Sequence, residues 1–163
     1  MKSKYILIFC VLAGLAMLSC TGGVSSPKSL AIQVFMALQN DDVNAYLRLC
    51  GGIDEQLYLY NRSDMDKDEK NEDITYMLDN RRDIEKDLEE ERRENFQEVQ
   101  SEYDWNNFKL DYVDLDNEDV RDGIKFYRDI GVYFKNGYKL EIDIVVNTQN
   151  GYKVMDDVAL SVE

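Results

Sequence analysis

The fold of this chain is decided by a stretch in which apolar and polar residues alternate, IKFYRDIGVYFKNGYKLEIDIVVNT (residues 124–148). Successive side chains of a β-strand point to opposite faces of a sheet, so the pattern predicts two strands joined near Asn136-Gly137. A two-residue loop at that point would set the apolar row of one strand beside the polar row of the next. A three-residue loop with Gly137 in a bulge pairs Ile130 with Ile142 and keeps the apolar rows on one face, so we predict the bulged loop.

Two further segments extend this hairpin into a meander. Residues 108–112 and 152–162 also alternate, whereas residues 114–122 read as an acidic loop. The tetrapeptide Asn-Gly-Tyr-Lys at 136–139 recurs at 150–153, and the same bulged loop there would pair Val146 with Val154 and Ile142 with Val158. Four strands joined by short turns predict an antiparallel sheet.

The residues before the sheet have the spacing of helices. Ser26 is a preferred N-cap and Pro27 fits the first helical position, which predicts a helix that begins at Pro27. Asp41 or Asp42 is expected to cap a second helix, and residues 53–60 suggest one or two more turns. Helices first and a meander last predict an α+β fold, with the N-terminal helices packed on a curved antiparallel sheet.

A long acidic helical region, about residues 64–104, separates these helices from the sheet. It holds 17 acidic and 7 basic residues, and its apolar residues recur at helical intervals. The pattern predicts one long helix, or two, with a thin apolar stripe and a charged outer face. An exposed apolar patch within residues 70–100 would favour a role in protein interaction.

Composition excludes several functions. The 163-residue chain has a net charge of −14, so we expect no nucleic acid partner. It has no histidine, which removes Ser–His and Cys–His nucleophile pairs and histidine metal ligands. Asp64, Asp66 and Asp68 begin like a calcium loop, but Glu69 stands where that loop needs glycine. We therefore expect no metal site and no cofactor.

The first 19 residues resemble a bacterial lipoprotein signal peptide. Lys2 and Lys4 precede an apolar run at 5–18 that is too short to span a bilayer, and the run ends at Ser19-Cys20. The resemblance implies that Cys20 is lipidated, becomes the N-terminus, and anchors the protein in the bacterial cell envelope, with the outer membrane as the expected membrane. The alternative is an ordinary signal peptide followed by an incidental cysteine. Residues 20–26 then read as a tether and residues 27–163 as a single domain.

Two segments carry a further resemblance. The first is the pattern Ser26-Pro27, Ala31, Phe35, Ala37-Leu38 and Asp41-Asp42, which resembles the opening of nuclear-transport-factor-2-like (cystatin-like) domains. The second is Gly151-Tyr152-Lys153-Val154, which resembles the strand that closes such domains. Within this family, the chain resembles the secreted lipoprotein domains of the lumazine-binding type. The resemblance implies a cone-shaped fold with a pocket. Both enzymes and non-enzymes use that fold, so it does not decide the function.

The candidate pocket comes from polar residues in the apolar rows. Arg128 interrupts one row and Asp156 another, and in the predicted register both lie opposite Ile144. In isomerases of the family that the chain resembles, a pocket carboxylate acts as base, so the resemblance implies Asp156 in that role. The alternatives are a bulge that turns one residue outward, or a buried ion pair. Cys50 reads as a buried core residue rather than a reactive thiol.

These observations leave three hypotheses for the function. The first is a cell-envelope lipoprotein with a non-catalytic domain that binds a small-molecule ligand or a protein partner. The second is a small isomerase- or dehydratase-like enzyme that uses Asp156. The third is an interaction protein that acts through its acidic helix.

The signal-peptide hypothesis makes a direct prediction about Cys20. Mass spectrometry of the membrane fraction should show a mature chain that begins at Cys20 and carries a diacyl or triacyl group. A soluble wild-type product with an unmodified Cys20 would contradict the hypothesis.

Overall fold

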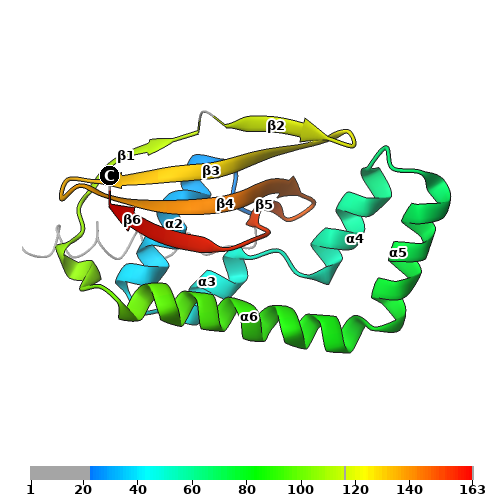
Figure 1. The fold of residues 1–163 in the computed structure, drawn as a ribbon, viewed down its shortest axis with the longest axis horizontal. Coiled ribbons are helices and arrows are strands. Elements are labelled where there is room, and N and C mark those ends of the chain that lie inside the picture. Colours follow the sequence, from blue (N-terminus) through cyan, green and yellow to red (C-terminus); the bar gives the residue numbers. More distant parts are fainter. Residues whose placement is uncertain (1–22, 116, 163) are drawn as a thin grey trace, which may run out of the picture.

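The computed structural model describes residues 23–115 and 117–162, and it confirms an α+β fold with the helices first and the sheet last (Figure 1). The helices are α2 (Pro27–Gln39), α3 (Val43–Leu49), α4 (Ile53–Arg62), α5 (Lys67–Asp79), α6 (Arg81–Ser101) and the short 3-10 helix η1 (Trp105–Asn107). The strands are β1 (Leu110–Asp114), β2 (Glu118–Arg121), β3 (Ile124–Phe134), β4 (Tyr138–Thr148), β5 (Gly151–Val154) and β6 (Val158–Val162). Within the described residues, no helix combines the length and the apolar character needed to cross a bilayer.

The first two helices begin where their capping residues predict. Ser26 Oγ accepts a hydrogen bond from the backbone N–H of Ser29 at 3.1 Å, and Asp42 Oδ1 accepts one from Ala45 N–H at 2.8 Å. Each bond satisfies a backbone donor that has no partner inside its own helix. Asp42, not Asp41, is therefore the cap of α3.

The acidic region folds as two helices. Asn80 separates α5 from α6, and its Nδ2 donates to the carbonyl of Tyr76 at 2.8 Å. Figure 1 shows α6 running along the length of the molecule past α3, while α4 and α5 lie near the end of the sheet at which β2 meets β3. The predicted meander is thus connected to the first helices by a helical arm that folds back on itself.

The sheet is antiparallel, and its two central strands are long while its two edges are interrupted. β3 pairs with β4, β1 and β2 lie one after the other along the free edge of β3, and β5 and β6 do the same along β4. The acidic loop expected over residues 114–122 was wrong in part, because its second half forms β2. The final predicted strand, residues 152–162, is split into β5 and β6.

The predicted bulged loop is confirmed in the first hairpin. Ile130 lies opposite Ile142 and Val132 opposite Leu140. Gly137 has φ of +80° and donates its backbone N–H to the carbonyl of Phe134 at 3.1 Å. Glycine adopts this left-handed conformation without the steric cost of a Cβ atom.

The second hairpin is predicted correctly at its far end and wrongly near its turn. Ile142 lies opposite Val158 as expected, but Val154 pairs with Val145 instead of Val146. The prediction assumed that one apolar row of β4 faces the core along its whole length. Both Val145 and Val146 are buried, however, so the two faces of the sheet are covered at this end and the row no longer determines the register.

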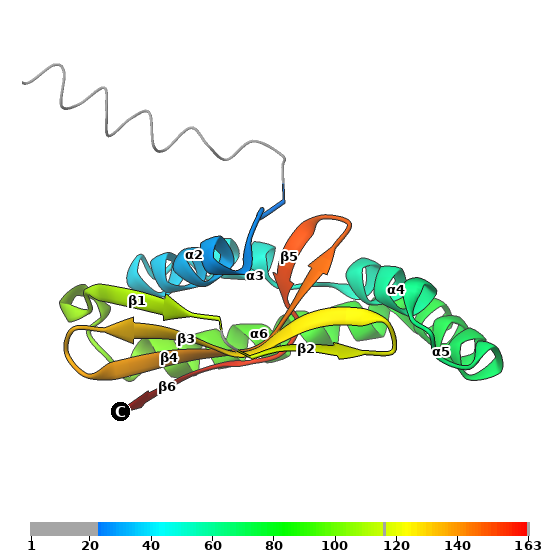
Figure 2. The ribbon, with the colours of Figure 1, turned by 90° about the horizontal axis from the view of Figure 1, so that it is seen from above.

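The change of register belongs to a bend that crosses all strands. The ladder between β3 and β4 skips Asp129 and Asp143, and Asp129 has φ of +49°. On the outer edges, β1 ends at Asp114 and β2 begins at Glu118, while β5 ends at Val154 and β6 begins at Val158. We call this line the bend; Figure 2 shows the sheet twisting along its length, with β5 turned away from β6. The half of the sheet that carries β1 and β6 is the near half, and the half that carries β2 and β5 is the far half.

The main hydrophobic core lies over the near half. Its buried apolar members include Leu30, Val34, Leu38, Tyr46, Phe96, Ile130, Val132, Leu140 and Ile142. A cluster of rings from α2, η1 and β3 extends it, with Phe108 and Phe134 at 5.0 Å between centroids and Trp105 and Phe108 at 4.8 Å. Removal of this apolar surface from water is the main stabilising contribution to the fold.

One polar residue, Asn95, fastens α6 to the sheet. Its Nδ2 donates to the carbonyl of Val158 at 2.9 Å, and its Oδ1 accepts from the backbone N–H of Val158 at 3.2 Å and from the hydroxyl of Tyr46 at 3.1 Å. The side chain therefore satisfies both backbone groups at the start of β6 and also joins α6 to α3. Removal of this half-buried amide would destabilise the protein, because its partners would lose their hydrogen bonds.

The described end of the predicted tether is held by the domain. Val24 forms a parallel bridge with Gly151, and its carbonyl accepts from the backbone N–H of Tyr152 at 2.9 Å. The tether predicted for residues 20–26 therefore does not extend as far as Val24. The predicted signal peptide and Cys20 lie outside the described residues.

The bend generates a prediction at Asp129. Asp129→Gly and Asp129→Val remove the same carboxylate, but only valine has a branched side chain that opposes a positive φ. We expect the valine protein to be less stable than the glycine protein by about 1–2 kcal/mol, measured by denaturant unfolding. Ordinary strand propensity gives the opposite order, since it favours valine over glycine, and that order would contradict a left-handed Asp129.

Candidate functional site

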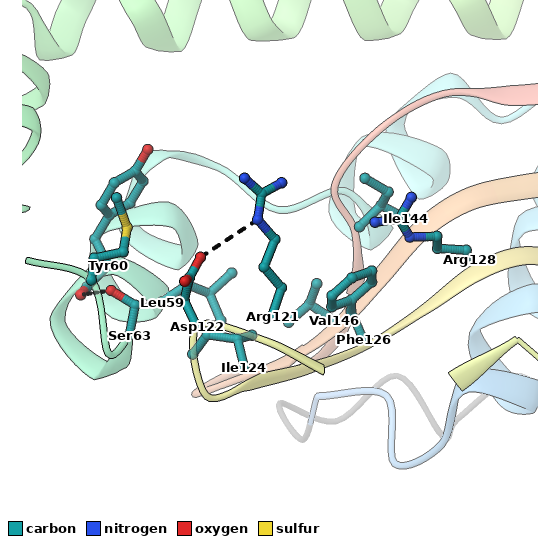
Figure 3. A pocket seen from close by; sticks show the side chains of 11 residues that line it. Leu59, Tyr60, Ser63, Arg121, Asp122, Ile124, Phe126, Arg128, Ile144 and Val146 are labelled. Atoms are coloured by element: carbon teal, nitrogen blue, oxygen red, sulfur yellow. Dashed lines mark hydrogen bonds and ion pairs between the residues drawn. The ribbon is translucent and has the colours of Figure 1, made fainter. Parts of the chain in front are cut away.

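A pocket of about 230 Å³ lies on the far half of the sheet, beside α4 (Figure 3). Its lining residues come from α4, the turn after it, the β2–β3 turn, β3 and β4: Leu59, Tyr60, Ser63, Met65, Arg121, Asp122, Ile124, Phe126, Arg128, Ile144 and Val146. Ligand pockets commonly measure about 300–1,000 Å³, so this one fits a small molecule or one end of a larger one.

The floor of the pocket is apolar and comes from paired strands. Phe126 lies opposite Val146, and Arg128 opposite Ile144, in the ladder between β3 and β4. Phe126 and Val146 are buried, and Ile124 and Ile144 are partly buried. Past the bend these residues face α4 instead of the main core, which is why the apolar row of β3 has two different partners along its length.

Two arginines stand among the apolar residues. Arg121 Nε lies 3.5 Å from Asp122 Oδ2, and Arg128 Nε lies 3.8 Å from Asp119 Oδ2. Both distances exceed the roughly 2.7–2.9 Å of a charge-assisted hydrogen bond, and half of the Arg128 side chain is exposed. The Arg128 guanidinium lies 5.0 Å from the centroid of the Phe126 ring, in cation–π geometry. Both guanidinium groups are therefore loosely paired and accessible to a ligand.

The turn between β2 and β3 closes one side of the pocket. Asp122 and Gly123 have φ of +49° and +73°, and Arg121 pairs with Ile124, so the loop has two residues with left-handed backbone. The carbonyl of Asp122 accepts from the backbone N–H of Asp64 at 2.8 Å, which joins the turn to the segment after α4. A Cβ at position 123 would lie 2.5 Å from Asp64 Oδ2 and would displace that side chain, and the positive φ favours glycine in any case. Asp-Gly between alternating residues is the hairpin signal that the sequence reasoning missed.

The structure brings Arg128 and Ile144 together but leaves Asp156 out. Asp156 is exposed between β5 and β6, and the backbone N–H of Met155 donates to the carbonyl of Ile144 at 2.8 Å. The predicted pairing of Asp156 with Ile144 was therefore wrong, because the bend inserts an extra residue into that edge. Of the alternatives considered, a bulge that turns one residue outward describes the result.

The bend itself gathers four aspartates. The pKa of Asp143 is raised above its usual value by partial burial and by the negative charges of Asp156, Asp129 and Asp157, while Arg128 lowers it. The pKa of Asp157 is also raised, first by partial burial and then by the negative charges of Asp156 and Glu98. In the part of the chain that the structure describes, no group of carboxylate or cysteine side chains has the arrangement needed to hold a metal ion.

Two other candidates from the sequence, Cys50 and the apolar residues of the acidic region, do not form a functional site. Cys50 is buried, and burial raises the pKa of its thiol to about 11, so the reactive thiolate is disfavoured at neutral pH. On α5, Tyr76 and Leu78 are 63% and 52% exposed. They are two positions apart and so point to different sides of the helix, and they do not form the continuous apolar patch that an interaction helix needs.

Comparison with known proteins adds no relative. No protein-family model matches the chain, and no curated protein or solved structure matches it at a significant level. The functional argument therefore rests on the geometry described above.

The raised pKa of Asp143 generates a prediction about pH. A carboxyl group whose pKa is higher in the folded state destabilises the fold above that pKa, and the penalty is relieved as the pH falls through it towards the unfolded value of 3.8. Asp143→Asn should therefore raise the melting temperature at about pH 7, and the gain should shrink at about pH 4. The exposed Asp111→Asn serves as a control for the charge change. A loss of stability at neutral pH in Asp143→Asn would contradict the assignment.

Proposed function

We propose that this chain is a non-catalytic binding domain, anchored at a bacterial membrane through a lipid on Cys20, which binds a small amphipathic molecule. The observation that carries the proposal is the pocket of the far half, where an apolar floor meets the loosely paired guanidinium group of Arg128. The apolar part of the ligand would lie on Ile124, Phe126 and Val146. Its hydrogen-bond-accepting or negatively charged end would face Arg128.

The fold supports the binding-domain part of the proposal, because it is the fold that the sequence resemblance implies. Helices precede a curved antiparallel sheet, as the nuclear-transport-factor-2-like resemblance implies. The position of the pocket, between the sheet and α4, also agrees with a cone that is open at one end. The lipid and the envelope location rest on the sequence of residues 1–20.

The enzyme hypothesis has less support than the binding hypothesis. Its proposed base, Asp156, does not line the pocket, and the carboxylate that does line it, Asp122, is partly exposed and lies beside Arg121. A general base must reach a bound substrate at hydrogen-bond distance, so the exposed position of Asp156 removes its geometric basis.

The binding hypothesis is tested with hexanoate as the amphipathic probe and 1-hexanol as its uncharged control. The protein is the mature chain with Cys20→Ser, which carries no lipid, and the readout is the NMR shift of the Ile124, Ile144 and Val146 methyl groups. We expect hexanoate to shift these methyl groups. Arg128→Gln should weaken hexanoate binding about threefold to tenfold, because it removes one charged hydrogen bond whose strength is reduced by the half-exposed position of Arg128.

The control is Lys135→Gln, which makes the same charge change at the opposite end of β3. It should bind hexanoate as well as the parent protein does. Equal binding of hexanoate and hexanol would remove Arg128 from the proposal, and unshifted pocket methyl groups with either probe would refute the pocket itself.

A further inference from the structure

A second and larger cavity, of about 670 Å³, lies between α3, the start of α4 and α6. Its walls include Asn44, Leu47, Arg48, Ile53, Leu88 and Arg92. Three of these residues are apolar and two are arginines. The cavity shares no lining residue with the pocket of the far half, so it is an independent site.

Arg92 has an unsatisfied donor inside the protein. Its Nη2 atom is buried and makes no hydrogen bond within the described residues, and it is the one buried side-chain nitrogen or oxygen there of which this is true. Arg92 also takes part in none of the ion pairs found in that part of the chain. A buried charged donor without a partner is costly, so a native protein normally supplies one or binds one.

The acidic residues of the cavity do not supply that partner. Glu85 and Glu89 line it, but Glu85 Oε1 accepts from Arg81 Nε at 2.9 Å. Glu89 Oε1 accepts from Arg93 Nε and Nη2 at 2.9 and 2.8 Å. Glu89 is thus paired with Arg93, while Glu85 shares Arg81 with Asp54, whose Oδ1 accepts from Arg81 Nη2 at 2.8 Å. Neither carboxylate of the cavity forms an ion pair with Arg92.

Two further groups make the cavity favourable for a negative charge. Arg48 lines it and forms no ion pair among the described residues, so a second guanidinium is available. The thiol of Cys50, also in the wall, stays protonated at neutral pH and brings no competing charge. The two arginines of the cavity wall balance its two glutamates, and in a chain with a net charge of −14 a formally neutral wall is a local exception to the overall field.

We propose that this cavity binds a small organic anion, with a carboxylate or phosphate group held by Arg92 and Arg48 and an apolar body against Leu47, Ile53 and Leu88. The planar guanidinium offers parallel N–H groups that match the two oxygens of a carboxylate or phosphate. The bound anion would offset the charge of Arg92, whose side chain lines the cavity and takes part in no ion pair among the described residues. The size of the cavity and its apolar wall favour an organic ligand over a bare inorganic ion.

Benzoate and phenyl phosphate are the probes, and benzyl alcohol is the uncharged control. Titration of the mature Cys20→Ser chain is followed through the methyl groups of Leu47, Ile53 and Leu88, while those of Ile124 and Ile144 report on the other pocket. We expect one or both anions to shift the first set, and the stronger of the two identifies the head group. Benzyl alcohol should bind at least tenfold more weakly.

The variants separate recognition from folding. Arg92→Gln should weaken anion binding at least tenfold and Arg48→Gln several-fold, while Arg82→Gln, an exposed arginine of the same helix outside the cavity, should leave binding unchanged. Because Arg48 is exposed, its variant tests the site even if Arg92→Gln unfolds the protein. Three results would each overturn the proposal, whatever happens at the sheet pocket. The first is equal anion binding by Arg48→Gln and Arg82→Gln, the second is equal affinity for benzoate and benzyl alcohol, and the third is the absence of shifts in the methyl groups of this cavity.

Discussion

A left-handed residue in the middle of β3, Asp129 with φ of +49°, marks the line on which the rest of the structure depends. A strand whose residues all have extended backbone would carry its apolar row along one continuous face. At Asp129 the pairing with β4 is interrupted, and both outer edges of the sheet break beside it. The apolar row of the near half can then pack on the main core, while Phe126 and Val146 of the far half line the pocket beside α4 and Val145 joins the core from the other face. One alternating pattern thus supplies both the core and a pocket.

The helices are attached to the two halves by a few polar contacts. Asn95 satisfies both backbone groups of Val158 and thereby holds α6 along β6. Asp64 donates its backbone N–H to the carbonyl of Asp122 and so holds the end of α4 at the β2–β3 turn. Because α4 is attached at one end to the sheet and lies against α6 on another side, it contributes walls to both cavities. A change that loosens α4 is therefore expected to disturb both sites together.

Charge is distributed unevenly over this frame. Most of the acidic excess lies in residues 64–104, the region that contains α5 and α6, with 17 acidic and 7 basic residues. Water screens these exposed charges, and pairs such as Arg93 with Glu89 offset part of the repulsion. The aspartates at the bend repel one another at closer range, which is the physical reason for the raised pKa of Asp143. Four loosely paired or unpaired arginines, by contrast, lie at the two cavities: Arg121 and Arg128 at the sheet pocket, and Arg48 and Arg92 at the second cavity. Ligand binding, rather than the acidic surface, is for that reason the function we favour.

The sequence by itself determined the elements and one register. Capping at Ser26 and Asp42 placed the first helices, alternation placed the long strands, and the bulged Asn136-Gly137 loop paired Ile130 with Ile142, because each of these features depends on residues close together in the chain. Arg128 and Ile144 were also predicted as neighbours for that reason. The bend, the exposed position of Asp156 and the unpaired Nη2 of Arg92 were decided only by the tertiary structure. They depend on which helix covers which half of the sheet, and a local pattern of apolar and polar residues does not contain that information.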